Sequence, residues 1–494
     1  MEWRHWDECC SIAMSSSFLI KMKLPLQPRR DFLNWGARGV GATAFTSLLA
    51  NDSGAAMQGV VRHHAPRARQ VVHICLVGGM SHVDSFDFKP ELVKSHGQEA
   101  QLAHKPDIFF GKIGSLRKND WEFKPRGKSG LEVSELFPHI AKQADKLTVI
   151  RSMISQSANH TPALFFENSG FEFNGFPSMG SWVSYGLGND TESLPAYIVL
   201  PDGRGDPNGG ASNWTNGFLS ARYQGVRFGA GDRPVRDLFP SEGIPAKQEL
   251  ATRHLLGQLN NRHQERTGLD DLLAARIRSY ELAARMQLSI PEVTDTGGES
   301  EATKEMYGIG AERTDDCGRR CLMARRLLER GVRFVQVFSG GPIGGSPRLS
   351  WDAHGDVIKN HGAEAGRIDQ PVAALLEDLS RRGMLEETLV LFTTEFGRTP
   401  FSESEKGKVG AGRDHNKSGF SVWMAGAGLQ PGIAYGATDE IGWKAEENPV
   451  TWHDFHATVL HLLGLDHERL TFYHNGIERR LTNVHGKVVR EILA

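Results

Sequence analysis

Short apolar runs that alternate with helical patterns are the feature that most limits the folds open to this chain. Apolar runs of strand length lie at 70–77, 147–151, 196–200, 332–338, 389–393 and 420–425. Helical patterns lie at 133–144, 162–168, 315–330, 370–381 and 451–463. Continuous apolar strands indicate burial on both faces of a sheet. The alternation therefore predicts an α/β fold whose central sheet is mostly parallel and covered by helices on both faces.

Two segments break this alternation and together form an expected insertion at about 202–315. Residues 202–232 are rich in Gly, Asn and aromatic residues, including Trp214 and Phe218, which predicts a surface loop able to stack on sugars. Residues 249–288 are polar and helix-forming, which predicts a helical hairpin or a lid packed on the sheet.

Charge and hydropathy exclude some partners. A formal net charge of -2 over 494 residues leaves no long-range field to attract nucleic acid or an anionic membrane. No stretch has the apolar length that a stable membrane span requires. We therefore expect neither nucleic acid nor a bilayer among the partners.

The first 68 residues have the features of an export leader. Paired arginines, Arg29 and Arg30, precede the apolar pair Phe32-Leu33, as in a twin-arginine signal. A mildly hydrophobic core follows at 39–49, and small residues near Ala55 offer a cleavage site. This predicts export by the twin-arginine machinery to the periplasm or beyond, with 69–494 as the folded domain. An amphipathic N-terminal helix with a chance arginine pair is the alternative.

Acidic and imidazole side chains follow successive predicted strands. Asp352 and His354 come after the strand at 332–338, Glu395 comes directly after 389–393, and Asp414-His415 precede the strand at 420–425. Loops at one edge of a parallel sheet share a crevice, so these groups can converge on one cation. Taken singly, each could instead cap a turn or be an ordinary loop residue.

Four strings, GGMSHVDSFDFKPEL, TTEFGRTP, GRDHN and YGATDE, give the chain a specific resemblance. It resembles an uncharacterised, twin-arginine-exported, sulfatase-like family within the alkaline phosphatase and sulfatase superfamily. That resemblance implies an alkaline-phosphatase-like fold. It also implies metal-dependent hydrolysis of phosphate or sulfate monoesters, small or carried on a glycan.

The resemblance assigns Asp352, His354 and His415 to one metal position and Glu395 to a second. Phe396 stands where the superfamily has a histidine ligand and cannot bind a metal, so a single cation is expected. A mixed set of nitrogen and oxygen ligands favours Zn or Mn over Ca. Asp414 is a further candidate ligand.

The superfamily also has a metal-binding Asp at the end of its first strand. Here the strand ends in Gly78-Gly79, and His82, Asp84 and Asp87 lie slightly beyond it. Of these we favour Asp84 for the site, with Asp87 left open; the alternative is that Asp84 and Asp87 simply fix the loop.

The segment His160-Thr161-Pro162, ten residues before Gly170, resembles the place of the sulfatase nucleophile. His160 could attack the ester, bind a metal, or leave Thr161 as the attacking group. A plain helix start, with Thr161 as cap and Pro162 in the first turn, is the alternative.

Two arginines, Arg398 and Arg413, could clamp the anionic group of a substrate, or could be structural ion-pair residues. The main functional alternative is a degenerate member of the superfamily that binds a sulfated glycan or a protein partner without turnover.

Overall fold

The computed structural model describes residues 62–102, 106, 108–229, 235, 246–267, 271–345 and 348–494. The predicted twin-arginine signal and its cleavage site fall on residues 1–61, outside this set. Within the described residues, His63 already contacts the domain, because its backbone N–H donates to the carbonyl of Gly464. Residues 63–68, which we assigned to the leader, therefore belong with the domain.

The main sheet has nine strands in the order β12, β4, β11, β8, β1, β7, β5, β6, with β15 beside β4. Every ladder is parallel except the two that β11 makes with β4 and β8. In chain order the strands are β1 (Gln70–Leu76), β4 (Leu147–Ile154), β5 (Tyr197–Leu200), β6 (Val226–Arg227), β7 (Phe334–Ser339), β8 (Thr388–Thr394), β11 (Phe420–Gly426), β12 (Ile433–Tyr435) and β15 (Val450–Thr451). The predicted mostly parallel sheet is confirmed.

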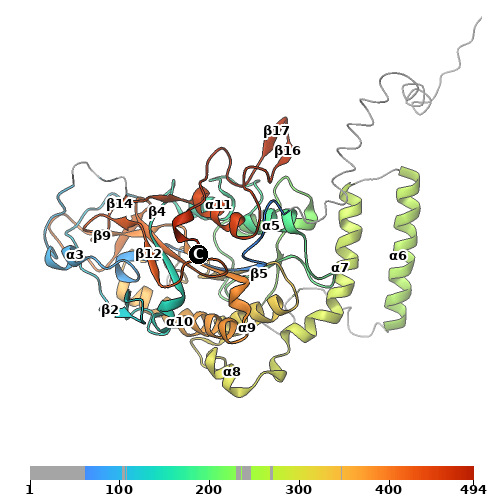
Figure 1. Ribbon diagram of the computed structural model, residues 1–494, viewed down its shortest axis with the longest axis horizontal. Helices are drawn as coiled ribbons and strands as arrows, with labels where there is room; N and C mark the ends of the chain where they lie inside the picture. Colours follow the sequence, from blue (N-terminus) through green and yellow to red (C-terminus); the bar gives the residue numbers. More distant parts are fainter. Residues whose placement is uncertain are drawn as a thin grey trace, which may run out of the picture. The chain divides into compact units, whose positions relative to one another are not determined.

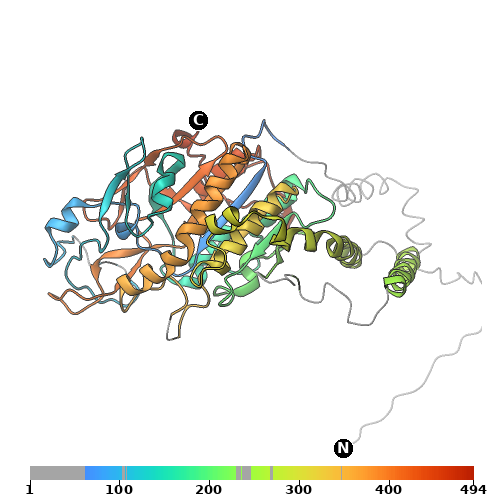
Figure 2. The ribbon, with the colours of Figure 1, turned by 90° about the horizontal axis from the view of Figure 1, so that it is seen from below.

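Helices cover both faces of this sheet (Figures 1 and 2). On β1, Val72, Ile74 and Leu76 join one hydrophobic cluster, together with residues of α9 (Asp315–Glu329) and α10 (Val357–Arg381). Val71 and Cys75 join the other cluster, with α4 (His160–Ser169), α5 (Met179–Leu187) and α11 (Trp452–Leu462). Successive strand residues point to opposite faces, so the continuous apolar runs serve both clusters. The α/β fold class is confirmed.

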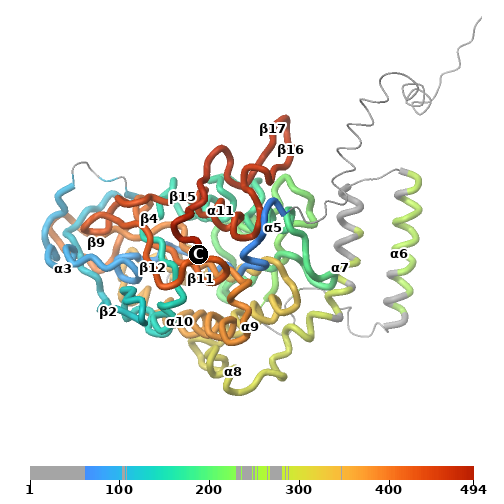
Figure 3. The backbone as a smooth tube through the Cα atoms, viewed as in Figure 1, coloured from blue at the N-terminus to red at the C-terminus, as the bar shows by residue number. Residues whose placement is uncertain are grey.

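The remaining elements lie in the connections between these strands and helices, and Figure 3 traces the backbone through them. They are η2 (His82–Asp84), α3 (Pro90–Lys94), β2 (Phe123–Arg126), β3 (Leu131–Ser134), η3 (Ile140–Lys146), η4 (Gly210–Trp214), η5 (Ala221–Tyr223), α6 (Ala246–Thr267), α7 (Asp271–Thr294), η6 (Thr296–Gly298), α8 (Glu301–Met306), η7 (Met384–Glu386), β9 (Gly397–Ser402), β10 (Arg413–Asn416), β13 (Ala437–Thr438), β14 (Ala445–Glu447), β16 (Phe472–His474), β17 (Ile477–Arg479) and η8 (Arg490–Ile492).

One predicted helix is wrong. Residues 133–144 form the end of β3, which pairs with β2, and then the start of the 3-10 helix η3. Pro138 has no backbone N–H, and the Asp369 carboxylate accepts the N–H groups of His139 and Ile140 at 2.7 Å each. These bonds hold the backbone outside a regular α-helix.

The expected insertion is only partly a surface feature. The Trp214 ring is buried, 3% exposed, with its centroid 5.7 Å from that of Phe338, so it cannot stack on a sugar. Phe218 is half-buried and stacks on His474. The long polar stretch forms α6 and α7, and Met286 and Ile290 of α7 enter the cluster that contains α9.

The turn after β1 packs directly against the segment that carries Asp352. Gly78 has a φ of +120°, and a Cβ atom there would lie 2.5 Å from the Asp352 nitrogen and 2.6 Å from the Trp351 nitrogen. Both contacts are with backbone atoms, which cannot move aside cheaply. The absence of a side chain at Gly78 therefore lets the edge of the sheet close around a site.

We expect Gly78→Ala to lower the free energy of unfolding by about 2–4 kcal/mol, from the strained φ and the backbone clash together. Gly383→Ala is the matched control, because Gly383 has a φ of +70° and open space around its Cβ position. Urea unfolding measures both. Equal losses in the two variants would show that the close approach at Gly78 adds nothing.

Candidate metal centre

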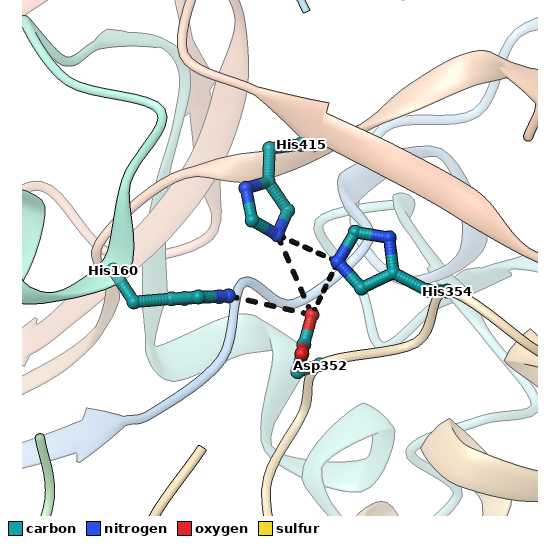
Figure 4. Close-up of side chains that lie close together, drawn as sticks. All are labelled: His160, Asp352, His354 and His415. Carbon is teal, nitrogen blue, oxygen red and sulfur yellow. Dashed lines mark hydrogen bonds and ion pairs between the residues drawn. The ribbon is translucent and has the colours of Figure 1, made fainter. Parts of the chain in front are cut away.

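Four side chains from three parts of the chain meet at the carboxyl edge of the sheet (Figure 4). The Nε2 atom of His354 lies 2.8 Å from Oδ1 of Asp352 and 2.9 Å from Nε2 of His415. The Nε2 atoms of His415 and His160 lie 3.4 and 3.3 Å from the same carboxylate oxygen. His160, Asp352 and His415 are buried, and His354 is nearly so.

The fold explains this meeting. Asp352 and His354 lie in the loop after β7, and His160 begins α4 after β4. His415 lies on β10, which pairs with β9 beyond the end of β8 and places His415 opposite Arg398. Since β4, β7 and β8 all run in the same direction, their carboxyl ends share one edge. The structure thus brings together the predicted residues Asp352, His354 and His415, and adds His160.

Each histidine uses its Nδ1 atom elsewhere. The Nδ1 atoms of His160 and His354 donate to carboxylate oxygens of Glu395 (2.8 Å) and Glu403 (2.5 Å). Nδ1 of His415 donates to the carbonyl of Ala158 at 2.6 Å. These acceptors carry no hydrogen, so each Nδ1 must carry one. Each neutral ring therefore turns an Nε2 lone pair toward Asp352, the arrangement that metal-binding histidines adopt.

Without a cation this arrangement is unfavourable. Two Nε2 lone pairs face each other at 2.9 Å, and Nε2 of His160 is buried without a hydrogen-bond partner. A proton could relieve the contact, but burial lowers the pKa of His160, His354 and His415, which disfavours the charged imidazolium. A bound cation would satisfy all of these groups at once.

The distances suit a small tetrahedral cation. Zinc with nitrogen and oxygen ligands at their usual bond lengths holds those ligand atoms roughly 3.4 Å from one another. The measured separations between the four donor atoms run from 2.8 to 3.4 Å where they are hydrogen-bonded or paired. The donor set is the mixture of nitrogen and oxygen atoms expected from the sequence, and the preference for Zn or Mn stays a prediction. That these groups hold a cation stays a prediction.

Glu395 has a different place from the expected one. Its Oε1 accepts hydrogen bonds from His160 Nδ1 and from the backbone N–H of Gly78, each at 2.8 Å. It is fully buried and lies outside the four-residue cluster. Glu395 therefore orients His160, and the described residues provide no second metal position around it.

Both candidate arginines are buried, and their guanidinium groups bind other groups of the protein. Arg398 is fully buried and bonds to Asp352 Oδ1 at 2.8 Å and to the carbonyls of Gly78 and Gly79. Arg413 pairs with Asp84 at 2.9 Å, and both are fully buried. The structure therefore favours the alternative that these are structural ion-pair residues, and neither can clamp a substrate.

The other acidic candidates also serve the fold. Asp84 accepts from Ser81 Oγ at 2.5 Å in addition to Arg413, and Asp87 pairs with Lys89 at 3.2 Å. Asp414 accepts the backbone N–H groups of Phe110 and His415 at 2.8 and 2.7 Å. None of these three carboxylates belongs to the four-residue cluster, but Asp414 forms a separate group of possible metal ligands with His354 and Glu403, so its predicted role as a ligand stays open. The structure therefore places no metal-binding role on Asp84.

Sequence reasoning missed two groups at this site. Glu403, at the end of β9, holds His354, and Arg348 contacts Oδ2 of Asp352 while its side chain stays 34% exposed. Unlike Arg398 and Arg413, Arg348 thus keeps part of its side chain open to solvent beside Asp352. Thr161 lies beside His160, half-buried, with no side-chain hydrogen bond to the described part of the chain. Nothing in the local sequence distinguishes Glu403 from its neighbour Glu405.

A second group of metal-binding residue types lies deeper in the sheet, where His73, Cys75 and Glu167 meet. Here the histidine ring carries its hydrogen on Nε2 and not on Nδ1. Gln336 Nε2 donates to His73 Nδ1 at 3.3 Å, so Nε2 of His73 carries the hydrogen and bonds to Thr393 Oγ1 at 2.7 Å. A protonated Nε2 cannot bind a metal, and this group is a hydrogen-bond network.

The fold and these side chains define an α/β protein with a candidate mononuclear metal centre at the carboxyl edge of a parallel sheet. The chain belongs to the family described as "Protein of unknown function (DUF1501)", whose model matches residues 68–493. No curated protein matches it in sequence.

Solved structures with some likeness to the chain include phosphate and sulfate ester hydrolases. A TAB5 alkaline phosphatase mutant with Mg bound is 10% identical, covers 82% of this chain and 100% of its own, and has a TM-score of 0.34. PsFucS1 sulfatase from Pseudoalteromonas sp. is 13% identical, with coverages of 93% and 76% and a TM-score of 0.35. The phosphonate monoester hydrolase SpPMH from Silicibacter pomeroyi is 10% identical, with coverages of 72% and 71% and a TM-score of 0.34. These likenesses are weak in both sequence and superposition.

We expect Glu403→Ala to weaken metal affinity by about 10–100-fold, because His354 loses the acceptor that fixes its ring and tautomer. Glu405→Ala, an exposed glutamate in the same loop, is the matched control. Competition with a chromogenic chelator measures both affinities. Equal affinity in the two variants would contradict a role for Glu403 at the centre.

Burial raises the pKa of Glu167 to about 8, from the ordinary value of 4.5 for a glutamate. Between these values the folded protein holds a proton that the unfolded chain has lost, so stability falls as pH rises through that window. The slope is up to about 1.4 kcal/mol per pH unit. Glu167→Gln should flatten this slope in urea unfolding from pH 5 to 8. An unchanged slope would show that Glu167 is ionised in the folded protein.

Proposed function

We propose that this protein is a metal-dependent hydrolase of phosphate or sulfate monoesters. The observation that carries the proposal is the convergence of three imidazole Nε2 atoms and Asp352 Oδ1 on one point, with every Nδ1 already donating elsewhere. His354, His415, Asp352 and His160 would hold the cation, preferably Zn or Mn. When bound, it would polarise the ester oxygens and stabilise the charge that develops on them.

His160 supports two roles at this position. As the fourth ligand it would complete a tetrahedral set, because its Nε2 lies 3.3 Å from Asp352 Oδ1. As the attacking group it would use the same lone pair, with Glu395 holding the Nδ1 hydrogen and stabilising positive charge on the ring. In both roles the start of α4 favours an anion, because no side chain caps the backbone N–H groups of its first turn, where His160 and Thr161 precede Pro162. Thr161 remains the alternative nucleophile.

Arg348 is the residue that we assign to the anion of the substrate. Its guanidinium is partly exposed and lies against Asp352 Oδ2, beside the candidate metal centre. A guanidinium can bind two oxygens of a phosphate or sulfate group at once. The anionic group of an incoming ester can therefore replace Asp352 as a partner for part of the Arg348 guanidinium.

The alternative, a protein that binds a sulfated glycan or a protein partner without turnover, also has an observation in its favour. Four protein ligands fill a tetrahedral set, whereas catalytic zinc sites usually keep one position open. His160 decides between the two: as an attacking group it would leave that position open, and as a permanent ligand it would close it.

We further propose that the chain is exported by the twin-arginine route to the periplasm or beyond, on the strength of Arg29 and Arg30 and the apolar core after them. Among the described residues, no helix has the length and apolar character needed to cross a membrane.

The test is the metal content of the purified protein, in wild type and in His354→Ala with His415→Ala, followed by a screen of phosphate and sulfate monoesters. We expect about one tightly bound cation per chain, lost in the double variant, and ester hydrolysis that requires it. His461→Ala, a half-buried histidine at the end of α11, is the matched control. If the wild-type protein is folded but metal-free after metal-replete expression, the proposal of a metal-dependent hydrolase is wrong.

A further inference from the structure

Two phenylalanine rings lie over the metal centre and remain open to solvent. The ring centroid of Phe109 lies 5.0 Å from that of His415, and that of Phe110 lies 4.7 Å from that of His354. Phe109 is 48% exposed and Phe110 is 52% exposed, whereas the histidines beneath them are largely covered. These two rings, which we name the aromatic rim, border the approach to the centre.

The rim is held in place by contacts other than its own rings. Ile108 is buried in a small hydrophobic cluster with Leu116, Phe401 and Trp443. The backbone N–H of Phe110 donates to Oδ2 of Asp414, the residue before His415. The chain on both sides of Phe109 is thus tied to the elements that carry the site. The exposed rings are therefore positioned by the fold, although leaving apolar surface in water costs about 25 cal/mol per Å².

The neighbouring charges indicate which part of a ligand would reach the rim. Arg348, together with the cation that the four-residue cluster would hold, favours an anionic group at the centre. The two phenylalanine rings are mutually perpendicular at 87° and offer no hydrogen-bonding atoms. They suit a flat or apolar ring attached to that anion, either an aryl group or the C–H face of a pyranose.

We propose that the substrate is a monoester whose ester oxygen is attached to, or one carbon away from, such a ring, and that Phe109 and Phe110 select it. This inference rests on the proposed hydrolysis and names its substrate class. Ringless esters would present the same anion to the centre and leave the rim uncovered.

The experiment compares three groups of monoesters, each as phosphate and as sulfate: para-nitrophenyl esters, glucose monoesters and ethyl esters. In Phe109→Ala with Phe110→Ala we expect KM for the ring-bearing esters to rise about tenfold, with little change for ethyl esters. Whether the para-nitrophenyl or the glucose series loses more identifies the ring. The control is Phe173→Ala, an exposed phenylalanine that follows the C-terminal end of α4, the end opposite His160.

Calorimetry on metal-loaded protein separates this inference from the proposed function. If no ester is hydrolysed, the hydrolase proposal fails, and tighter binding of ring-bearing than of ethyl monoesters, lost in the rim variant, still supports the rim. Equal binding of the two kinds, or losses that are equal for both, overturns it. Unchanged metal content in the rim variant shows that the centre has stayed intact.

Discussion

The buried guanidinium of Arg398 is the constraint on which the arrangement around the centre depends. It bonds to the carbonyls of Gly78 and Gly79 after β1, to Asp352 in the loop after β7, and to the Arg413 carbonyl on β10. Burial lowers its pKa only to about 10, so it stays charged at neutral pH. A charge with no exposed surface must keep all of these partners, because losing any one would leave a buried polar group unsatisfied. Segments that are distant in sequence are thereby held in one geometry.

Much of the fold followed from the sequence because each main strand is marked by a short apolar run in the local sequence. The apolar runs that became β1, β7 and β8 need burial on both faces, and their order with the helices permits few sheets. The same reasoning placed Asp352 and His354 at a strand end. It could not find Glu403, since its contact with His354 depends on how β9 pairs with β10. It left two roles open for Arg398 and Arg413, because a sequence does not tell whether an arginine points into a site or beneath it.

Residue type alone does not identify a metal centre in this chain. His73 lies with Cys75 and Glu167 in a group that resembles the candidate centre in composition, yet Gln336 fixes its hydrogen on the wrong nitrogen. At the candidate centre, Glu395, Glu403 and the Ala158 carbonyl fix the hydrogens on the opposite nitrogens. The difference between a ligand and a hydrogen-bond donor is set by the second partner of each ring.

The spacing of the four donors along the chain links cation binding to folding as a whole. His160 and His415 are brought together across more than half of the sheet domain, after β4, β7, β8 and β10 have all taken their places. No fragment that lacks either part has the complete donor set. A cation would therefore bind the native state far better than any partly formed one, and would raise stability in proportion to the logarithm of its concentration. Cation binding would then show that the whole sheet has formed. A shortage of the cation would lower the amount of folded protein.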